Sequence, residues 1–468
     1  MLRRGFLDTR PLRSSPAFRR VWVTGLASVI GAQVMFVAVL QQVWEMTSSP
    51  VWTGAIGLVR ALPLVVFGVL GGAIADAIDR RTLVRATMSL QVLVGLGLAT
   101  HALTGSQSLL VLFALVAAGA GIGAVDAPAR RTFIPRLLER DQVSAGIALQ
   151  HLGFQATMLG GPALGGVILS QWDAAVCYLI YAGAVLVAMY GVIRLPAMPV
   201  QVEGQRRTFT AIAEGVRFVT TRPVLRGSFA SDLAATLLSM PISLFPLINE
   251  VRFGGDPQTL GLFLSCVAAG GMLAGLTSGW VTRADRPGLV QLGAGAVWGI
   301  ALAAFGLAGP LWLALGMLVV AGAADTISVV SRGGMVQLVT PDSHRGRVNA
   351  LEHTVGVAGP ELGNARAGLV AGMTSAAGAL VSGGLACVVV IGWITLRNRE
   401  LRAFRVSVDA RKVPNAQAPP SQDPAGWGVD ERAPGEQDLG ARRLGERVPA
   451  EQDPARPAEQ DPAKPDEQ

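Results

Sequence analysis

The stretch "GGAIADAIDRRTLVRA", from Gly71 to Ala86, places aspartates and three arginines between two long apolar runs. Each of these runs is about 20 residues long or more, which is the length a helix needs to cross a hydrocarbon core about 30 Å thick. The charged stretch is therefore expected to be a short loop between two membrane-spanning helices. In a soluble protein the same residues would indicate only an exposed turn.

The rest of the chain repeats this pattern. Of its 468 residues 51% are apolar and 15% are charged, which is typical of a membrane protein with many spans. The polar, arginine-rich start lacks the features of a cleavable signal peptide, so the first span is expected to stay as an anchor. Twelve spans are predicted, at about residues 21–43, 51–75, 82–103, 108–127, 143–170, 174–195, 224–249, 258–281, 288–308, 310–335, 347–371 and 376–396.

The arginines indicate the orientation, because short cytoplasmic loops retain Lys and Arg. They fall between spans 2 and 3, 4 and 5, 6 and 7, 8 and 9, and 10 and 11, and after span 12. The breaks on the other side hold none except Arg252. Both termini are therefore expected in the cytoplasm, with the chain in the inner (cytoplasmic) membrane. The arginines that indicate this orientation are called the topology arginines below. They include Arg80, Arg81, Arg85, Arg130, Arg131, Arg194, Arg217, Arg222, Arg283, Arg286, Arg332, Arg345, Arg347, Arg397 and Arg405.

The organisation along the chain predicts two related halves. Residues 1–200 and 224–405 hold six spans each, and "SGWVTRADRPGLV" after span 8 echoes "GGAIADAIDRRTLV" after span 2. The linker, 201–223, contains "TFTAIAEGVRFV", whose apolar stripe (Phe209, Ile212, Val216, Val219) predicts a short helix on the cytoplasmic membrane surface. Residues 406–468, rich in Pro, Glu, Gln and Asp, predict a disordered cytoplasmic tail.

The quoted loop resembles the signature of the major facilitator superfamily between spans 2 and 3. Within that superfamily, "PAFRRVW", "TSGWVTRADRPGLV" and "HRGRVNAL" are similar to segments of bacterial enterobactin-type siderophore exporters and their drug-efflux relatives. The resemblance covers about residues 14–405. It implies an all-α membrane fold of two six-helix pseudo-repeats and proton-coupled efflux of small molecules by alternating access.

The loop signature suggests a cytoplasmic gate. Gly72 would let span 2 pack closely, and Asp76 would accept hydrogen bonds from a facing helix end or from arginines while the cytoplasmic side is closed. Arg80 and Arg81 either take part in this gate or are there only because short cytoplasmic loops retain Arg.

A second resemblance lies in span 5. There "LGGPALGG" is similar to an antiporter signature, in which Gly161, Pro162, Gly165 and Gly166 would shape a bend against the opposite half. Thr157 stands where that signature has its leading glycine, and the span-4 arginine of drug exporters is missing.

Ionisable side chains inside spans are costly and are candidate functional groups. Arg60 is either the partner of an acid on another helix or a group that faces an anionic cargo. The carboxylates Asp232, Asp325 and Glu361 are candidates for proton coupling, since burial and exposure can change their protonation. The remaining candidates for the substrate cavity are Gln33, His151, Gln155 and Arg366; the glutamines and the histidine could equally bond to neighbouring helices.

The chain is therefore expected to be an exporter with a siderophore-like or amphipathic drug-like cargo, working as a monomer in the bilayer and driven by the proton gradient. The alternatives are multidrug or macrolide-type efflux without a siderophore role, an uptake permease, or, in another class, a membrane enzyme or channel. No Walker A pattern occurs, no cofactor or metal site is expected, and nucleic acid is not an expected partner. Cys177, Cys266 and Cys387 are expected to be buried apolar side chains.

Overall fold

A computed structural model describes residues 8–75, 77–196, 198 and 208–405 of the chain, and within these residues every regular element is helical. Eleven helical segments are long and apolar enough to cross a membrane. The twelfth long helix, α16, has 32 residues but many charged ones, so its place in the set follows from its packing along α3. The twelve expected spans correspond to α2 (Pro16–Thr47), α3 (Pro50–Ala75), α4 (Arg80–Leu103), α5 (Leu109–Arg131), α7 (Val143–Gln171), α8 (Ala174–Ile193), α10 (Pro223–Ser239) with α11 (Phe245–Phe253), α12 (Pro257–Leu276), α14 (Pro287–Leu307), α15 (Leu311–Val339), α16 (Asp342–Met373) and α17 (Ala376–Arg397).

Short elements connect these helices. They are α1 (Arg10–Ser14), α6 (Phe133–Leu137), α9 (Thr208–Thr221), the 3-10 turn η2 (Ile242–Leu244), α13 (Gly279–Thr282) and α18 (Arg399–Ala403). Several long helices begin at a capping side chain that accepts a hydrogen bond from the first turn, as Ser15 does from the Phe18 amide and Asp173 from the Val176 amide. Such caps satisfy amides that have no partner within the helix, which explains why the helices start there.

The seventh expected span differs from the prediction of one unbroken helix over 224–249. In the structure α10 ends at Ser239, and the chain continues through η2 into α11. Pro241 explains the break, because it donates no backbone hydrogen bond and holds the preceding Met240 in an extended conformation. The eighth span is also shorter than expected and ends at Leu276.

The linker helix forms as α9, but its surroundings differ from the prediction. Val216, expected on the apolar stripe, is exposed, whereas Val219 of the same stripe packs with Phe218 into a cluster with Val348 of α16. The helix therefore directs its apolar face to α16, and the Glu214 carboxylate pairs with Arg347 of that helix at 2.7 Å. The side chains of residues 208–212, and the tail from residue 406, lie outside the described residues.

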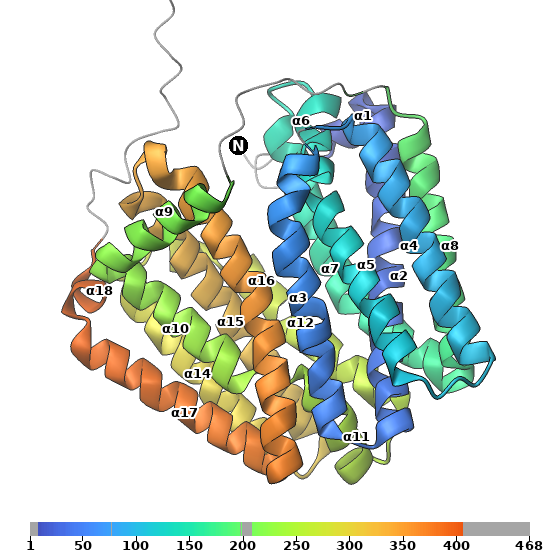
Figure 1. Cartoon of the computed structure of the whole chain (residues 1–468). Coiled ribbons are helices and arrows are strands. Elements are labelled where there is room, and N and C mark those ends of the chain that lie inside the picture. Colours follow the sequence, from blue (N-terminus) through green and yellow to red (C-terminus); the bar gives the residue numbers. More distant parts are fainter. Residues whose placement is uncertain (1–7, 76, 197, 199–207, 406–468) are drawn as a thin grey trace, which may run out of the picture. The chain divides into compact units, whose positions relative to one another are not determined.

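The long helices pack in two sets that meet along two seams. In the first set α2 packs on α7 and α8, α3 on α5, and α4 on α8; in the second α10 packs on α16 and α17, and α15 on α12 and α14. The sets meet where α3 runs beside α16, as Figure 1 shows, and where α7 packs on α12. Glycines allow close approach, as at Gly322, where an added Cβ would collide with the Val267 carbonyl.

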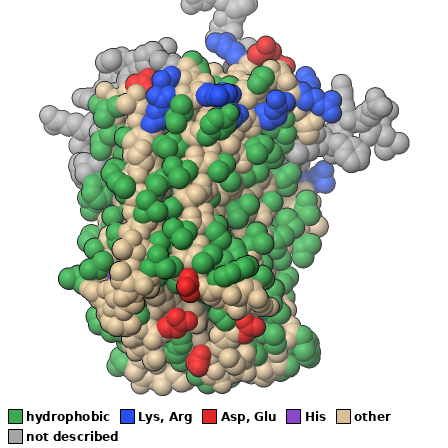
Figure 2. Space-filling view, turned by 90° about the vertical axis from the view of Figure 1, so that its right-hand side faces the viewer, with side chains coloured by type: hydrophobic (Ala, Val, Ile, Leu, Met, Phe, Trp, Pro, Cys, Tyr) green, Lys and Arg blue, Asp and Glu red, His purple; other side chains and the backbone are tan. Residues whose placement is uncertain are grey.

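The surface separates by chemical type (Figure 2). Hydrophobic side chains cover the middle of the face shown, basic side chains gather at one end, and acidic ones occur both at that end and toward the other. Arg80 begins α4 and Arg194 ends α8 at what is called here the basic end, whereas Asp173, at the start of α8, lies at the opposite end. An apolar belt between two polar ends is the arrangement that a bilayer requires. Cys177 and Cys387 are buried and Cys266 is half-buried, as expected, and none forms a disulfide.

Candidate functional site

A cavity of about 600 Å³ lies between α3, α5 and α16. Because it is lined by the last half of α3, the last turns of α5 and the first half of α16, it lies toward the basic end. Its walls are mostly small and apolar, and Arg131 is the charged residue among the described lining residues. They are Leu64, Val65, Gly68, Gly123, Ala124, Ala127, Pro128, Arg131, Gly346, Asn349, Ala350, His353, Thr354, Val357 and Ala358.

The α16 wall follows a helical repeat that the sequence analysis missed. Gly346, Asn349, His353 and Val357 recur every three or four residues, so one face of the helix carries small and polar groups. That spacing is visible in the sequence and could have identified the lining face. The sequence alone does not say that α3 and α5 lie opposite.

One hydrogen bond crosses the cavity wall between the two sets of helices. The Arg131 guanidinium contacts Nε2 of His353 at 3.2 Å. A guanidinium only donates, so Nε2 accepts and the ring proton resides on Nδ1 in this arrangement. The sequence analysis treated Arg131 only as a topology arginine, and here it faces a cavity.

Toward the opposite end the seam between α3 and α16 is closed by backbone contact. A Cβ added at Gly54 would lie 2.9 Å from both the Asn364 carbonyl oxygen and the Gly368 Cα. At Gly57 it would collide with the Glu361 carbonyl oxygen. The cavity therefore has no passage along this seam.

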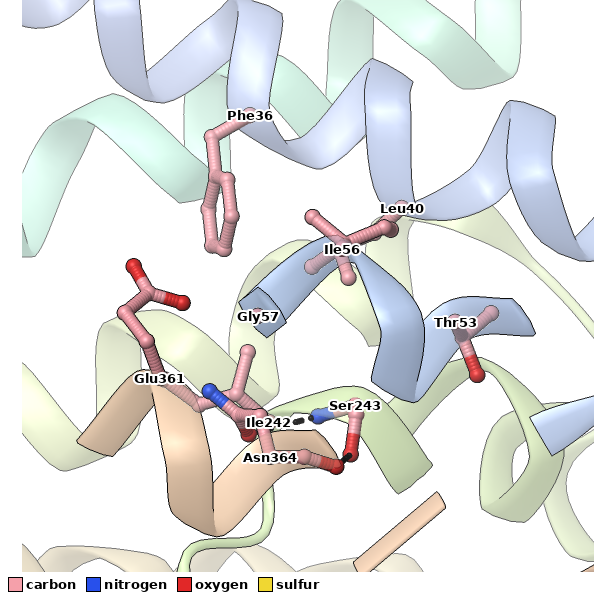
Figure 3. A pocket seen from close by; sticks show the side chains of 9 residues that line it. All are labelled: Phe36, Leu40, Thr53, Ile56, Gly57, Ile242, Ser243, Glu361 and Asn364. Atoms are coloured by element: carbon pink, nitrogen blue, oxygen red, sulfur yellow. Dashed lines mark hydrogen bonds between the residues drawn. The ribbon is translucent and has the colours of Figure 1, made fainter. Parts of the chain in front are cut away.

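An ion pair joins the two sets of helices just where the closed seam begins. Arg60 Nε of α3 lies 3.2 Å from Glu361 Oε1 of α16, and the guanidinium carbon lies 4.7 Å from the centre of the Phe36 ring. Figure 3 shows the Glu361 carboxylate extending toward Phe36. Of the two roles considered for Arg60, pairing with an acid on another helix is the one observed. Next to the pair, Asn364 accepts from the Ser243 amide at 3.1 Å (Figure 3).

A buried cluster surrounds Arg332 of α15. Its guanidinium pairs with Asp232 of α10 and with Glu352 of α16, the latter at 3.1 Å. Asp325, two turns earlier on α15, is exposed, and its charge interacts with Asp232 and Arg332. The sequence analysis considered Arg332 only as a topology arginine; in the structure its side chain is 5% exposed and has two acidic partners.

The loop of the opening stretch is tied to the end of α8. Arg81 donates to the Leu195 carbonyl and Arg85 to the Ile193 carbonyl, where guanidinium groups complement the helix dipole. Asp79 accepts from the amides of Thr82 and Met198 at 2.9 and 2.7 Å. Burial opposes ionisation of Asp79, but these two amide hydrogen bonds lower its pKa below the ordinary value.

The expected gating residues have different outcomes. Gly72 lies in the last turn of α3 and Arg80 is the first residue of α4. Asp76 lies outside the described residues. Arg81 contacts its own set of helices here, so the structure shows it supporting the loop.

The span-5 motif packs α7 against a helix of its own set, α2, and against α12 of the other set. Gly161 and Gly165 pack α7 on α2, since a Cβ on them would lie 2.6 Å from Gln33 Cβ and 3.0 Å from Val34 Cα. Gly166 faces α12, where an added Cβ would lie 2.6 Å from the Pro257 carbonyl oxygen. The Pro162 carbonyl also meets α12, at Gly261.

The other candidate cavity residues do not line the 600 Å³ cavity. Gln33 donates to the Met158 sulfur at 3.4 Å, His151 is exposed, and Gln155 is half-buried on α7. Arg366 donates to the Leu238 carbonyl in the last turn of α10. The carbonyls of this turn have no partner within the helix, because α10 ends before Pro241. Among the described residues no group of His, Cys, Asp and Glu side chains is placed to hold a metal ion.

The sequence profile of a family described as transmembrane secretion effectors matches residues 8–421. The enterobactin exporter EntS of Citrobacter koseri is 28% identical over 402 residues, which cover 85% of this chain and 96% of that protein. The enterobactin exporter EntS of Salmonella typhi is 27% identical over 408 residues, with the same coverage.

Solved structures share the fold at low identity. The nucleoside transporter NupG, as a D323A mutant, superposes with a TM-score of 0.67 at 14% identity and covers 83% of this chain and 99% of its own. A bacterial homologue of the human lysosomal transporter Spinster, in an inward-facing and unoccupied conformation, gives a TM-score of 0.63 at 16% identity, covering 85% of this chain and 97% of its own.

Proposed function

Since this chain belongs to the transmembrane secretion effector family and is a major facilitator superfamily transporter, we propose that it exports acidic, siderophore-like small molecules in exchange for protons. The observation that carries the proposal is the cavity near the basic end, with Arg131 in its wall and a closed seam beyond it. A cavity toward one end, with a closed seam beyond it, fits one half of an alternating-access cycle.

The charge of the lining favours an acidic cargo. The described lining residues include one guanidinium and no carboxylate, and a guanidinium binds carboxylate or catecholate oxygens through charge-assisted hydrogen bonds. The relatives named enterobactin exporters support the same class of cargo and the outward direction.

The orientation follows from the arginines. The basic end lies in the cytoplasm, with both termini there, and residues 1–200 and 224–405 move against each other about the linker 201–223. The protein works as a monomer in the inner membrane, and residues 406–468 form a cytoplasmic tail.

Asp325 is the carboxylate that we propose to carry the coupled proton. Asp232 and Glu361 each have a guanidinium partner, whereas Asp325 is exposed and lies two turns before Arg332 on α15. Binding and releasing a proton there would change the charge of the cluster that joins α10, α15 and α16.

The test uses inside-out membrane vesicles and enterobactin. An imposed gradient, acidic inside, should drive accumulation; Asp325→Asn should remove the response to the gradient. Asp76→Asn should slow accumulation while the protein remains inserted. Accumulation that is independent of the gradient would exclude antiport, and transport of ethidium in place of enterobactin would favour the drug-efflux alternative.

A further inference from the structure

The Arg60–Glu361 pair forms the closed end of the cavity. On α3 the lining residue Leu64 lies one turn from Arg60, and on α16 the lining residues Val357 and Ala358 lie one turn from Glu361. Two of the three helices that line the cavity, α3 and α16, therefore carry the ion pair one turn beyond their lining residues. Beyond it, Gly54 and Gly57 pack on the α16 backbone.

The two charges differ in how accessible they are. The Arg60 side chain is 30% exposed and that of Glu361 is 12% exposed. An anion that moves along the cavity would therefore meet the guanidinium, while the carboxylate is shielded between Phe36 and the seam. Arg60 has more donors than the single Nε contact uses, and a guanidinium can bind a second planar acid.

We propose that the Arg60–Glu361 pair is a lock that the acidic group of the cargo opens by exchange. The cargo takes the place of Glu361 on Arg60, and the seam between α3 and α16 loses the ion pair that holds it at this turn. This inference rests on the proposed function. It adds that Arg60 binds the charged group of the cargo, and that this binding leads to opening of the end opposite the basic end.

Exchange explains why the lock would respond to an acid. Separating a partly buried pair leaves two charges without partners, which is strongly unfavourable, and an incoming anion removes the part of that cost that belongs to Arg60. A neutral molecule of the same shape offers no such replacement and would leave the lock closed. After exchange, the remaining contacts at this seam include those of Gly54, Gly57 and Gly368, which are backbone packing contacts without charge.

The test measures access from the outer side. Thr53, 1% exposed and next to this seam, is changed to cysteine in a chain whose Cys177, Cys266 and Cys387 are replaced by alanine. A membrane-impermeant maleimide is added outside intact cells. Glu361→Gln should raise the labelling rate about tenfold without cargo, since the pair is lost. Glu214→Gln, which removes the exposed acid of another ion pair with α16, is the matched control and should leave the rate unchanged.

The second arm tests exchange in proteoliposomes with 2,3-dihydroxybenzoate or neutral catechol on the cytoplasmic side. With 2,3-dihydroxybenzoate the labelling rate at position 53 should rise, and with neutral catechol it should not. Arg60→Gln should remove this difference between the two compounds. The proposal would be overturned if Glu361→Gln and Arg60→Gln both kept the labelling rate of the native pair and unchanged melting temperatures. An equal response to acid and catechol would also overturn it. Failure of the proposed function appears separately, as absent enterobactin accumulation in vesicles.

Discussion

Gly166 provides a sharp test of how the opposite end is sealed. Its position on α7 faces α12, and a Cβ there would lie 2.6 Å from the Pro257 carbonyl oxygen, 3.1 Å from Gln258 Cα and 3.2 Å from Gly261 Cα. All three are backbone atoms, so no side chain can rotate away. The first distance is about 0.8 Å below the 3.4 Å at which ordinary contact begins. Gly166→Ala must therefore move α7 and α12 apart.

The expected effect is a change in the balance of states. Overpacking of this kind costs about 1–3 kcal/mol, and it acts only where the two helices touch. The state that is closed at the opposite end should therefore lose about 5- to 150-fold in population relative to the state open there. Gly160→Ala, one residue earlier in the same helix, is the matched control, because nothing lies within 4 Å of its added Cβ.

Pulsed electron paramagnetic resonance can measure this balance. Spin labels at Thr104, after α4, and Thr374, after α16, occupy exposed positions at the opposite end on the two sets of helices. Without cargo, Gly166→Ala should increase the long-distance population and Gly160→Ala should not. Equal distance distributions for the two variants would refute the conclusion that the α7–α12 contact seals this end.

Three further predictions concern stability and cargo binding. Arg332→Gln leaves the buried Asp232 and the half-buried Glu352 unpaired and should lower the free energy of unfolding by about 3–5 kcal/mol, seen as a lower melting temperature. Arg345→Gln, at an exposed ion pair, should change it by less than about 1 kcal/mol. Asp79→Asn should destabilise by about 1 kcal/mol at neutral pH. Because the folded pKa of Asp79 is lowered below its ordinary value of 3.8, this contribution is complete above that value and disappears only as the pH falls through the lower folded value, so the melting temperatures of the variant and the native protein should still differ at about pH 4 and converge only at more acidic pH. Arg131→Gln should weaken enterobactin binding about tenfold by calorimetry; unchanged affinity would remove Arg131 from the cargo site.

The sequence predicted the helices well because the cue is local. An apolar run of sufficient length specifies a membrane span wherever it occurs, and the break after Ser239 could also have been read from Pro241. The polar α16 was predicted as a span although its composition alone would exclude it. The span was placed at about residues 347–371 from the spacing of the polar breaks along the chain, and the structure has a long helix there that packs along α3.

The candidate site was harder to predict because it depends on partners from distant segments. Sequence reasoning identified Arg60 and Glu361 separately, and even considered an acidic partner for Arg60, but 301 positions separate them and only the fold brings α3 beside α16. Arg366 was assigned to the cavity, yet it binds a carbonyl that became available when α10 ended early. Depth in the membrane could be read from the sequence, but the direction of a side chain around its helix could not.

The most direct test of alternating access is a reversible crosslink at the end that the structure shows closed. The Ser170 hydroxyl of α7 and the Gln258 side-chain amide of α12 lie 2.9 Å apart. Cysteines at these positions, with the native three replaced, should therefore be joined by a short bifunctional thiol reagent whose link reduction cleaves. Crosslinked protein should stop enterobactin export, and reduction should restore it. Export at the native rate with the crosslink intact would contradict the account.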